Sequence, residues 1–230
     1  MTLTALKILR KGRSPATKVM KFNIITTLKK LEQLILHMES SSNMAVIGSA
    51  RSVDQFVTDE DFYTIDTAII SRSKDFVPLL IRLFKLTTQS KLDKKVREAL
   101  AALGEFSLDP LIGLLETEHG PRAASVLADI GNPRALSPLI RMADIYPAYM
   151  NSAIKLGRKA GNDEAIEFFI SILMANKPLG FPESFLKKSE NQKRVAATNV
   201  VILALQDISG ETHKSADQWS EWWKGKTGSK

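Results

Sequence analysis

The sequence predicts an all-α protein built as an α-solenoid, a stack of paired helices. A short phrase centred on Pro-Leu-Leu or Pro-Leu-Ile occurs three times, and its prolines stand at positions 78, 110 and 138, with steps of 32 and 28 residues. Each phrase precedes a second helical segment that ends at a glycine, namely Gly104, Gly131 or Gly161. Units of helix, turn and helix at this period are typical of stacked arrays.

The first part of the chain predicts a basic arm followed by a long helix. Residues 1–13 are rich in cations, and Ser14-Pro15 favours a helix start because serine caps a helix and proline presets its first φ. Between residues 19 and 38 apolar side chains recur at three- and four-residue steps, which predicts one amphipathic helix. We expect its apolar stripe to cover the end of the array. A partner-binding or membrane-surface helix is the alternative, because lysines flank the stripe.

A linker and an acidic helix start are predicted next. Residues 40–50 are rich in serine and have no helical period, which indicates a linker. The run Asp59-Glu60-Asp61 predicts a helix N-terminus, since carboxylates favour the positive end of the helix dipole. A divalent cation is the alternative, but the glycine and the spaced ligands of a calcium loop are absent.

The repeats extend over residues 74–210 with two departures from the pattern. Tyr146-Pro147-Ala148-Tyr149 places two aromatic residues at the junction between paired helices. Residues 176–189 form an insertion that contains Phe181 and Phe185. Insertions in solenoids often carry binding residues, so this loop either contacts a partner or folds back on the last repeat.

The C-terminal stretch predicts a capping helix. Ser215 followed three residues later by Gln218 forms a capping-box pattern. Trp219, Trp222 and Trp223 then stand at i, i+3 and i+4, on one helix face. We expect this helix to seal the last apolar face of the array, with stacking on a ligand as the alternative.

Three phrases in the array resemble a known family. They are Val-Arg-x-Ala-Leu-Ala-Ala-Leu-Gly at 96–104, Pro-Leu-Ile-x-Leu-Leu at 110–115 and Leu-Ala-Asp-Ile-Gly-Asn-Pro-Arg-Ala-Leu at 127–136. Over residues 74–144 the chain resembles HEAT-like repeats of the type described in phycobilin lyases, and its Trp-rich end is similar to the tail of many bacterial HEAT-like proteins. The resemblance implies a right-handed α-solenoid of about four repeats. Family members are mostly binding scaffolds with a few enzymes among them, so the resemblance implies an architecture and not an activity.

The charge pattern predicts a basic groove. The chain has a formal net charge of +7, and basic residues gather near the starts of the second helices. Second helices line the concave face in this class of fold, so these residues would concentrate an anionic partner. The alternative is that they are solvated or paired with acidic neighbours such as Asp93 and Glu98. The candidate binding residues are Lys94, Lys95, Arg97, Arg122, Tyr146, Tyr149, Lys155, Arg158, Lys159, Phe181, Phe185, Lys193 and Arg194.

Several kinds of site have no support in the sequence. The absence of cysteine excludes disulfides, a thiol nucleophile and a cysteine-ligated zinc site. The three histidines, His37, His119 and His213, are far apart and predict no metal site. A nucleophile elbow, a phosphate loop and a dinucleotide fingerprint are absent, so we predict no catalytic residues and no cofactor. The repeated His-Glu pairs of helical-repeat iron hydroxylases are also missing.

The sequence therefore predicts a protein of four parts: a basic disordered arm over 1–13, a helical region over 14–72, HEAT-like repeats over 73–210, and a cap helix with tail over 211–230. We expect a non-catalytic binding scaffold that engages an acidic protein partner through the groove and the 176–189 loop. Nucleic-acid binding through the arm and groove is the alternative, and a DNA alkylpurine glycosylase with HEAT-like repeats or a bilin lyase comes after it. No run of about 20 apolar residues and no export signal is present, so a cytoplasmic location is expected.

Overall fold

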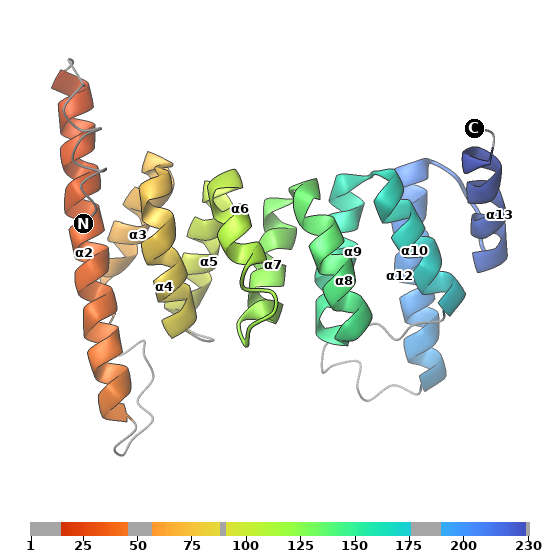
Figure 1. Ribbon diagram of the computed structural model, residues 1–230, viewed down its shortest axis with the longest axis horizontal. Coiled ribbons are helices and arrows are strands. Elements are labelled where there is room, and N and C mark those ends of the chain that lie inside the picture. The colour runs from red at the N-terminus through yellow and green to blue at the C-terminus, as the bar shows by residue number, and fades with distance from the viewer. Residues whose placement is uncertain (1–14, 46–56, 88–90, 176–189, 229–230) are drawn as a thin grey trace. The chain divides into compact units, whose positions relative to one another are not determined.

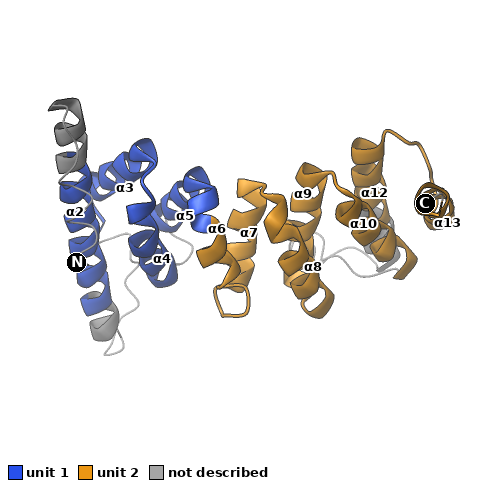
Figure 2. Ribbon diagram, turned by 45° about the horizontal axis from the view of Figure 1, so that its top comes forward, with its two compact units in different colours: residues 1–107 blue, residues 108–230 orange. Residues whose placement is uncertain are grey.

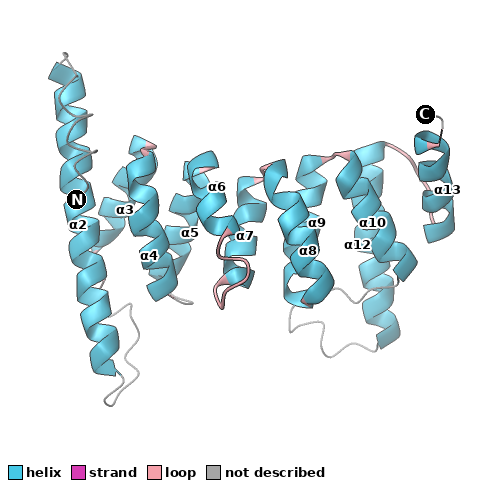
Figure 3. Ribbon diagram, viewed as in Figure 1, coloured by secondary structure: helices cyan, strands magenta, loops and turns pink. Residues whose placement is uncertain are grey.

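The protein is all-α, as the sequence predicts. The structure, a computed structural model, describes residues 15–45, 57–87, 91–175 and 190–228, with the side chains of residues 23–40, 57–87, 91–175 and 198–228. Every regular element within these ranges is a helix (Figure 3). The chain divides into two compact units, residues 1–107 and residues 108–230 (Figure 2).

The first unit is built around one long helix. Its helices are α2 (Pro15–Ala45), α3 (Asp59–Ser71), α4 (Val77–Leu86) and α5 (Lys91–Leu103), with a 3-10 turn at Lys74–Phe76, and α6 (Glu105–Ile112) crosses into the second unit. Helix α2 packs against α3 and α4, and both of these pack against α5 (Figure 1). Their shared core contains Leu31, Ile35, Phe76 and Phe84, all fully buried.

The apolar stripe of α2 faces this core. Leu31, Leu34, Ile35 and Met38 are at most 6% exposed, whereas Lys30 is exposed. Each fully buried leucine or isoleucine stabilises the fold by roughly 1.5–3 kcal/mol. The described part of the stripe thus packs against α3 and α4, and the prediction that it covers the end of a repeat array stays a prediction.

The predicted linker over residues 40–50 is wrong in its first part, because α2 continues to Ala45. Residues 46–50 lie outside the described residues. Nucleating a helix is costly, but adding a residue to an existing helix costs little. A serine-rich stretch with weak helix propensity can therefore extend α2 by a further turn.

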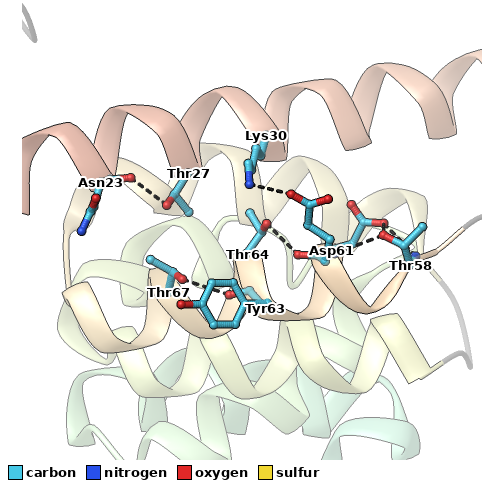
Figure 4. A network of polar contacts seen from close by, with 9 residues as sticks. Asn23, Thr27, Lys30, Thr58, Asp61, Tyr63, Thr64 and Thr67 are labelled. Atoms are coloured by element: carbon cyan, nitrogen blue, oxygen red, sulfur yellow. Dashed lines mark hydrogen bonds and ion pairs between the residues drawn. The ribbon is translucent and has the colours of Figure 1, made fainter.

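Helix α3 begins at the acidic run, as predicted, and a capping box between Thr58 and Asp61 fixes this start (Figure 4). The Asp61 N–H donates to Thr58 Oγ1 at 3.4 Å, and the Thr58 N–H donates to Asp61 Oδ2 at 2.8 Å. Lys30 Nζ of α2 donates to Glu60 Oε1 at 2.6 Å. This hydrogen bond and the lysine charge lower the pKa of Glu60. The three carboxylates therefore include one that caps α3 and one that ties it to α2.

The second unit is a series of helices that pack on their neighbours. Its helices are α7 (Gly120–Ile130), α8 (Leu136–Ile145), α9 (Met150–Ala160), α10 (Asp163–Ala175), α12 (Glu190–Ser209) and α13 (Ala216–Thr227), with 3-10 turns at Pro133–Ala135 and Pro147–Tyr149. Helices α7 and α8 each pack against α9, and α10 packs against α9 and α12 (Figure 1). Leu127, Leu139, Leu156 and Phe169 are fully buried between them.

Glycines end the second helices as the repeat pattern predicts. Gly104, Gly131 and Gly161 follow α5, α7 and α9 with φ values of +55°, +75° and +59°. Gly210 follows α12 with φ +75°. Glycine adopts this left-handed conformation without the strain that a side chain would add. These helix ends were therefore predictable from local sequence.

The C-terminal helix α13 is capped and buried as expected. The Gln218 N–H donates to Ser215 Oγ and the Ser215 N–H donates to Gln218 Oε1, both at 3.3 Å, so the capping box is confirmed. Trp219 is fully buried and Trp223 is 9% exposed, whereas Trp222 is half-buried. The helix packs against α10. Its tryptophans therefore close the apolar face of that helix.

Candidate functional site

The predicted basic residues of the first unit lie next to carboxylates. On α5, Lys95 Nζ lies 2.6 Å from Asp66 Oδ1 of α3, and Arg97 Nε lies 3.2 Å from Asp93 Oδ2. Lys94 Nζ is 4.0 Å from Glu98 Oε1, and its side chain is 75% exposed. Each of these three cations thus has an acidic neighbour, and none of the three lines the two pockets of the second unit that follow.

Three other predicted cations come together in one surface depression of the second unit, which we name the cation pocket. It has a volume of about 320 Å³ and is lined by Asn151, Ile154, Lys155, Arg158, Lys159 and Val200. All but Val200 come from α9, and Val200 comes from α12. Val200 and Leu203, one turn apart on α12, are 40% and 55% exposed. The pocket therefore combines a cationic wall with an apolar edge.

The cations of this pocket bridge α9 to its neighbouring helices. Lys155 pairs with Asp129 of α7, and Arg158 pairs with Asp207 of α12. Lys159 Nζ donates to the carbonyl oxygens of Ala128 and Asp129, both at 2.9 Å, in the last turn of α7. These carbonyls carry the negative end of the helix dipole, which favours a cation there.

The pairs remain open to exchange with a partner. The side chains of Lys155 and Arg158 are 53% and 48% exposed, and their carboxylate partners are exposed to a similar degree. Ion pairs of this kind contribute only about 0–1 kcal/mol each. A carboxylate from another molecule can therefore replace Asp129 or Asp207 at small cost. Three cations against two carboxylates also leave a positive excess in the pocket.

The two predicted tyrosines lie at a larger surface pocket of the second unit, which we name the tyrosine cleft. It has a volume of about 780 Å³ and is lined by Leu115, Glu116, Thr117, Glu118, Pro121, Arg141, Met142, Ile145, Tyr146, Ala148 and Tyr149. Its floor is apolar, with Leu115 and Met142 at 2% and 4% exposed. Ile145 and Tyr146 are 62% and 53% exposed at its edge. Large apolar side chains of this kind are available to a partner.

The two tyrosines play different parts in the cleft. Their ring centroids are 6.2 Å apart, but Tyr146 is exposed whereas Tyr149 is 4% exposed. The Tyr149 hydroxyl donates to the Leu115 carbonyl oxygen at 2.6 Å. This bond ties the start of α9 to the turn between α6 and α7. Tyr149 therefore supports the floor, and Tyr146 is the tyrosine that offers surface to a partner.

The buried hydroxyl of Tyr149 predicts a pH dependence of stability. Burial, and secondarily the charge of Tyr146, raises the pKa of Tyr149 above its ordinary value of 10.0. A raised folded-state pKa means that this contribution to stability is complete below the unfolded pKa and is lost as pH rises towards the folded pKa. Tyr149→Phe should therefore lower the urea unfolding free energy by about 1 kcal/mol at pH 8 and make its decline between about pH 9 and pH 11 shallower.

Tyr63→Phe is the matched control for this prediction. Tyr63 is 72% exposed, so its removal should change neither the stability nor the slope. If the unfolding free energy declined equally steeply with pH in Tyr149→Phe and in the unaltered chain, the Tyr149 hydroxyl would not be a buried hydrogen-bond donor.

The remaining predicted residues are not brought into either pocket. Arg122 lies half-buried on α7. Lys193 and Arg194 belong to α12, but their side chains lie outside the described residues, as do Phe181 and Phe185. Sequence reasoning missed Ile145, Glu116 and Glu118 in the cleft and Val200 at the cation pocket. An apolar residue at the end of a helix, next to Tyr146, was the available signal for Ile145.

Comparison of the chain with protein-family models, with curated proteins and with solved structures found no match. Among the described side chains, no three histidine or acidic residues are grouped as a metal site would require. None of the described helices combines the length and apolar character that a membrane crossing needs. The helices of the described residues define an all-α protein. Because the comparisons found no match, its function must be argued from the two pockets.

Proposed function

We propose that the chain is a non-catalytic binding scaffold, a right-handed α-solenoid of about four HEAT-like repeats that holds an acidic protein partner. Paired helices, the proline phrases in α4, α6 and α8 and the glycines after α5, α7 and α9 support the repeat architecture. In a repeat protein each unit contacts its neighbours and leaves a continuous surface for partners.

The observation that carries this proposal is the cation pocket. Lys155, Arg158 and Lys159 come together on α9, and their acidic partners are weakly held. The exposed aliphatic side chains of Val200 and Leu203 lie on the adjoining helix. A partner segment with carboxylates next to an aliphatic residue satisfies both walls. Phe181 and Phe185 stand in the segment that joins α10 to α12, but they lie outside the described residues, so the proposal depends on α9 and α12.

The test is a titration of the full chain with a labelled peptide of alternating glutamate and leucine, followed by fluorescence anisotropy. Lys155→Gln/Arg158→Gln/Lys159→Gln should weaken binding by about tenfold or more, because three charges of the site are lost. Raising the salt concentration should weaken binding to the unaltered chain, since the contacts are exposed.

Asp129→Asn/Asp207→Asn is the matched control, because it breaks the same ion pairs from the other side. It removes the acidic partners of Lys155 and Arg158, so affinity for the acidic peptide should rise. The melting temperature should fall by about the same small amount as in the triple substitution, because both variants break the same two ion pairs. If both variants weaken binding equally, the pairs serve packing alone and the proposed site is wrong. Affinity capture with mass spectrometry would then be used to identify the natural partner.

Nucleic acid is the second candidate partner because of the charge of the first unit. That unit has 17 basic and 11 acidic residues, whereas the second has 15 and 14. A titration of labelled duplex and single-stranded DNA at several salt concentrations distinguishes the two readings, since phosphate contacts give a steep fall of log affinity with log salt. Tight DNA binding that survives the α9 triple substitution would favour the first unit as a nucleic-acid site.

A further inference from the structure

We infer that the tyrosine cleft is a second docking site, and that it takes a partner segment in which a large apolar side chain stands next to Lys or Arg. The cation pocket selects negative charge, so this inference goes beyond the proposed function and does not depend on it. It follows from three features of the cleft: an apolar interior, a negative rim and a preformed turn.

The interior of the cleft suits an aromatic or aliphatic side chain. Leu115 and Met142 form a buried apolar floor, and Ile145 and Tyr146 stand exposed beside it. Ile145 is the last residue of α8, and its side chain is exposed, whereas a side chain that faced the core would be buried. An apolar group that enters the cleft removes the surface of Ile145 and Tyr146 from water, at about 25 cal/mol per Å² buried.

The rim of the cleft carries an excess of negative charge. Glu116 and Glu118 are 71% and 86% exposed; Arg141 Nη2 lies 3.4 Å from Glu116 Oε1, and His119 Nε2 lies 3.4 Å from Glu118 Oε1, so the lining holds one permanent cation against two carboxylates. Helix α8 ends at the cleft, and the carbonyls of its last turn add partial negative charge. A cation beside the bound apolar group is therefore favoured, and a carboxylate is repelled.

The cleft does not need to form when the partner arrives. The Tyr149 hydroxyl holds the Leu115 carbonyl, and Gly120 sits against both, which fixes the turn that carries Glu116 and Glu118. A preorganised site avoids part of the ordering cost of binding. A short linear segment is therefore a sufficient partner for this surface.

The experiment titrates the full chain with a labelled peptide of two phenylalanines flanked by four arginines. A charge-inverted peptide has glutamate in place of arginine. In a chain that carries the α9 triple substitution, which removes the cation pocket, the basic peptide should bind more tightly than the inverted one. Glu116→Gln/Glu118→Gln should weaken its binding about three- to tenfold, and Ile145→Ser about tenfold. High salt should reduce the effect of the glutamate substitutions but not that of Ile145→Ser.

Matched controls change similar residues elsewhere. Glu167→Gln/Glu221→Gln removes two exposed carboxylates of the same unit, and Ile70→Ser removes an isoleucine that is 81% exposed in the first unit. Both should bind the basic peptide as the unaltered chain does. Equal binding by the cleft variants and the controls would overturn the inference, as would preference for the inverted peptide in a chain that carries the α9 triple substitution. All variants change exposed side chains, and an unchanged thermal melt verifies their folding.

Discussion

Trp219→Ala is expected to lower the free energy of unfolding by about 3–5 kcal/mol, the largest effect of any substitution proposed for this chain. Trp219 belongs to α13, which packs against α10, and its side chain is fully buried. Its ring meets His213 edge-on at 4.9 Å between centroids and Trp222 at 5.5 Å. Truncation removes a large apolar group and leaves a cavity that the surrounding helices fill only in part. Urea unfolding monitored by far-ultraviolet circular dichroism measures the change.

Two further variants locate the effect of Trp219 in packing. Trp219→Phe keeps an aromatic ring and should cost less than half as much. The free energy lost by Trp219→Phe is small because no hydrogen bond is broken: the Trp219 indole N–H has no hydrogen-bond partner among the described residues. Trp222→Ala should also cost less, since Trp222 is half-buried. Unchanged melting of Trp219→Ala would show that α13 does not cap the second unit.

Gly120→Ala is expected to destabilise the fold by about 2–4 kcal/mol. An added Cβ would overlap the Tyr149 hydroxyl oxygen and the Leu115 carbonyl oxygen. Because one of these atoms belongs to the backbone, the turn between α6 and α7 must shift, and the hydrogen bond from Tyr149 to Leu115 is lost. Equilibrium unfolding in urea measures the loss. The same variant should weaken binding of the basic peptide, because the shifted turn carries the rim of the tyrosine cleft.

A double-mutant cycle tests the geometry at Gly120. Tyr149→Phe should cost less in the Gly120→Ala background than in the unaltered chain, since the hydrogen bond is already broken there. Gly113→Ala is the control, because its Cβ would meet its nearest neighbour, the Pro110 carbonyl oxygen, at an ordinary 3.5 Å. It should leave stability nearly unchanged. If the losses of unfolding free energy from Gly120→Ala and Tyr149→Phe added up in the double variant, the close approach of Gly120 to the Tyr149 hydroxyl would be contradicted.

Several ion pairs of the second unit join residues that lie about 25 positions apart in the chain. Arg134 Nη2 lies 3.0 Å from Asp109 Oδ1, and Arg141 Nη2 lies 3.4 Å from Glu116 Oε1, each pair 25 residues apart in the chain. Lys155 and Asp129 are 26 residues apart. A charge that has no partner within its own helix can thus pair with a distant residue, as Lys155 of α9 does with Asp129 of α7. The basic residues of α9 are bridges between helices as well as candidate contacts.

The sequence by itself determined the features that depend on nearby residues. The helix ends at Gly104, Gly131 and Gly161, the helix start at the acidic run 59–61 and the capping box at Ser215 follow from contacts within four residues. The all-α class follows from the helical period of the apolar residues. Such features are legible because the interactions that create them lie within one turn of helix.

Tertiary structure alone decided the features that depend on distant residues. Tyr146 and Tyr149 are three positions apart, yet one is exposed and the other buried, because the Tyr149 hydroxyl meets a carbonyl 34 residues earlier. The partner of Arg158 is Asp207, 49 residues away, so its partial neutralisation could not be inferred from its own helix. Pairing between helices depends on how they pack, and packing brings together side chains that no local spacing connects.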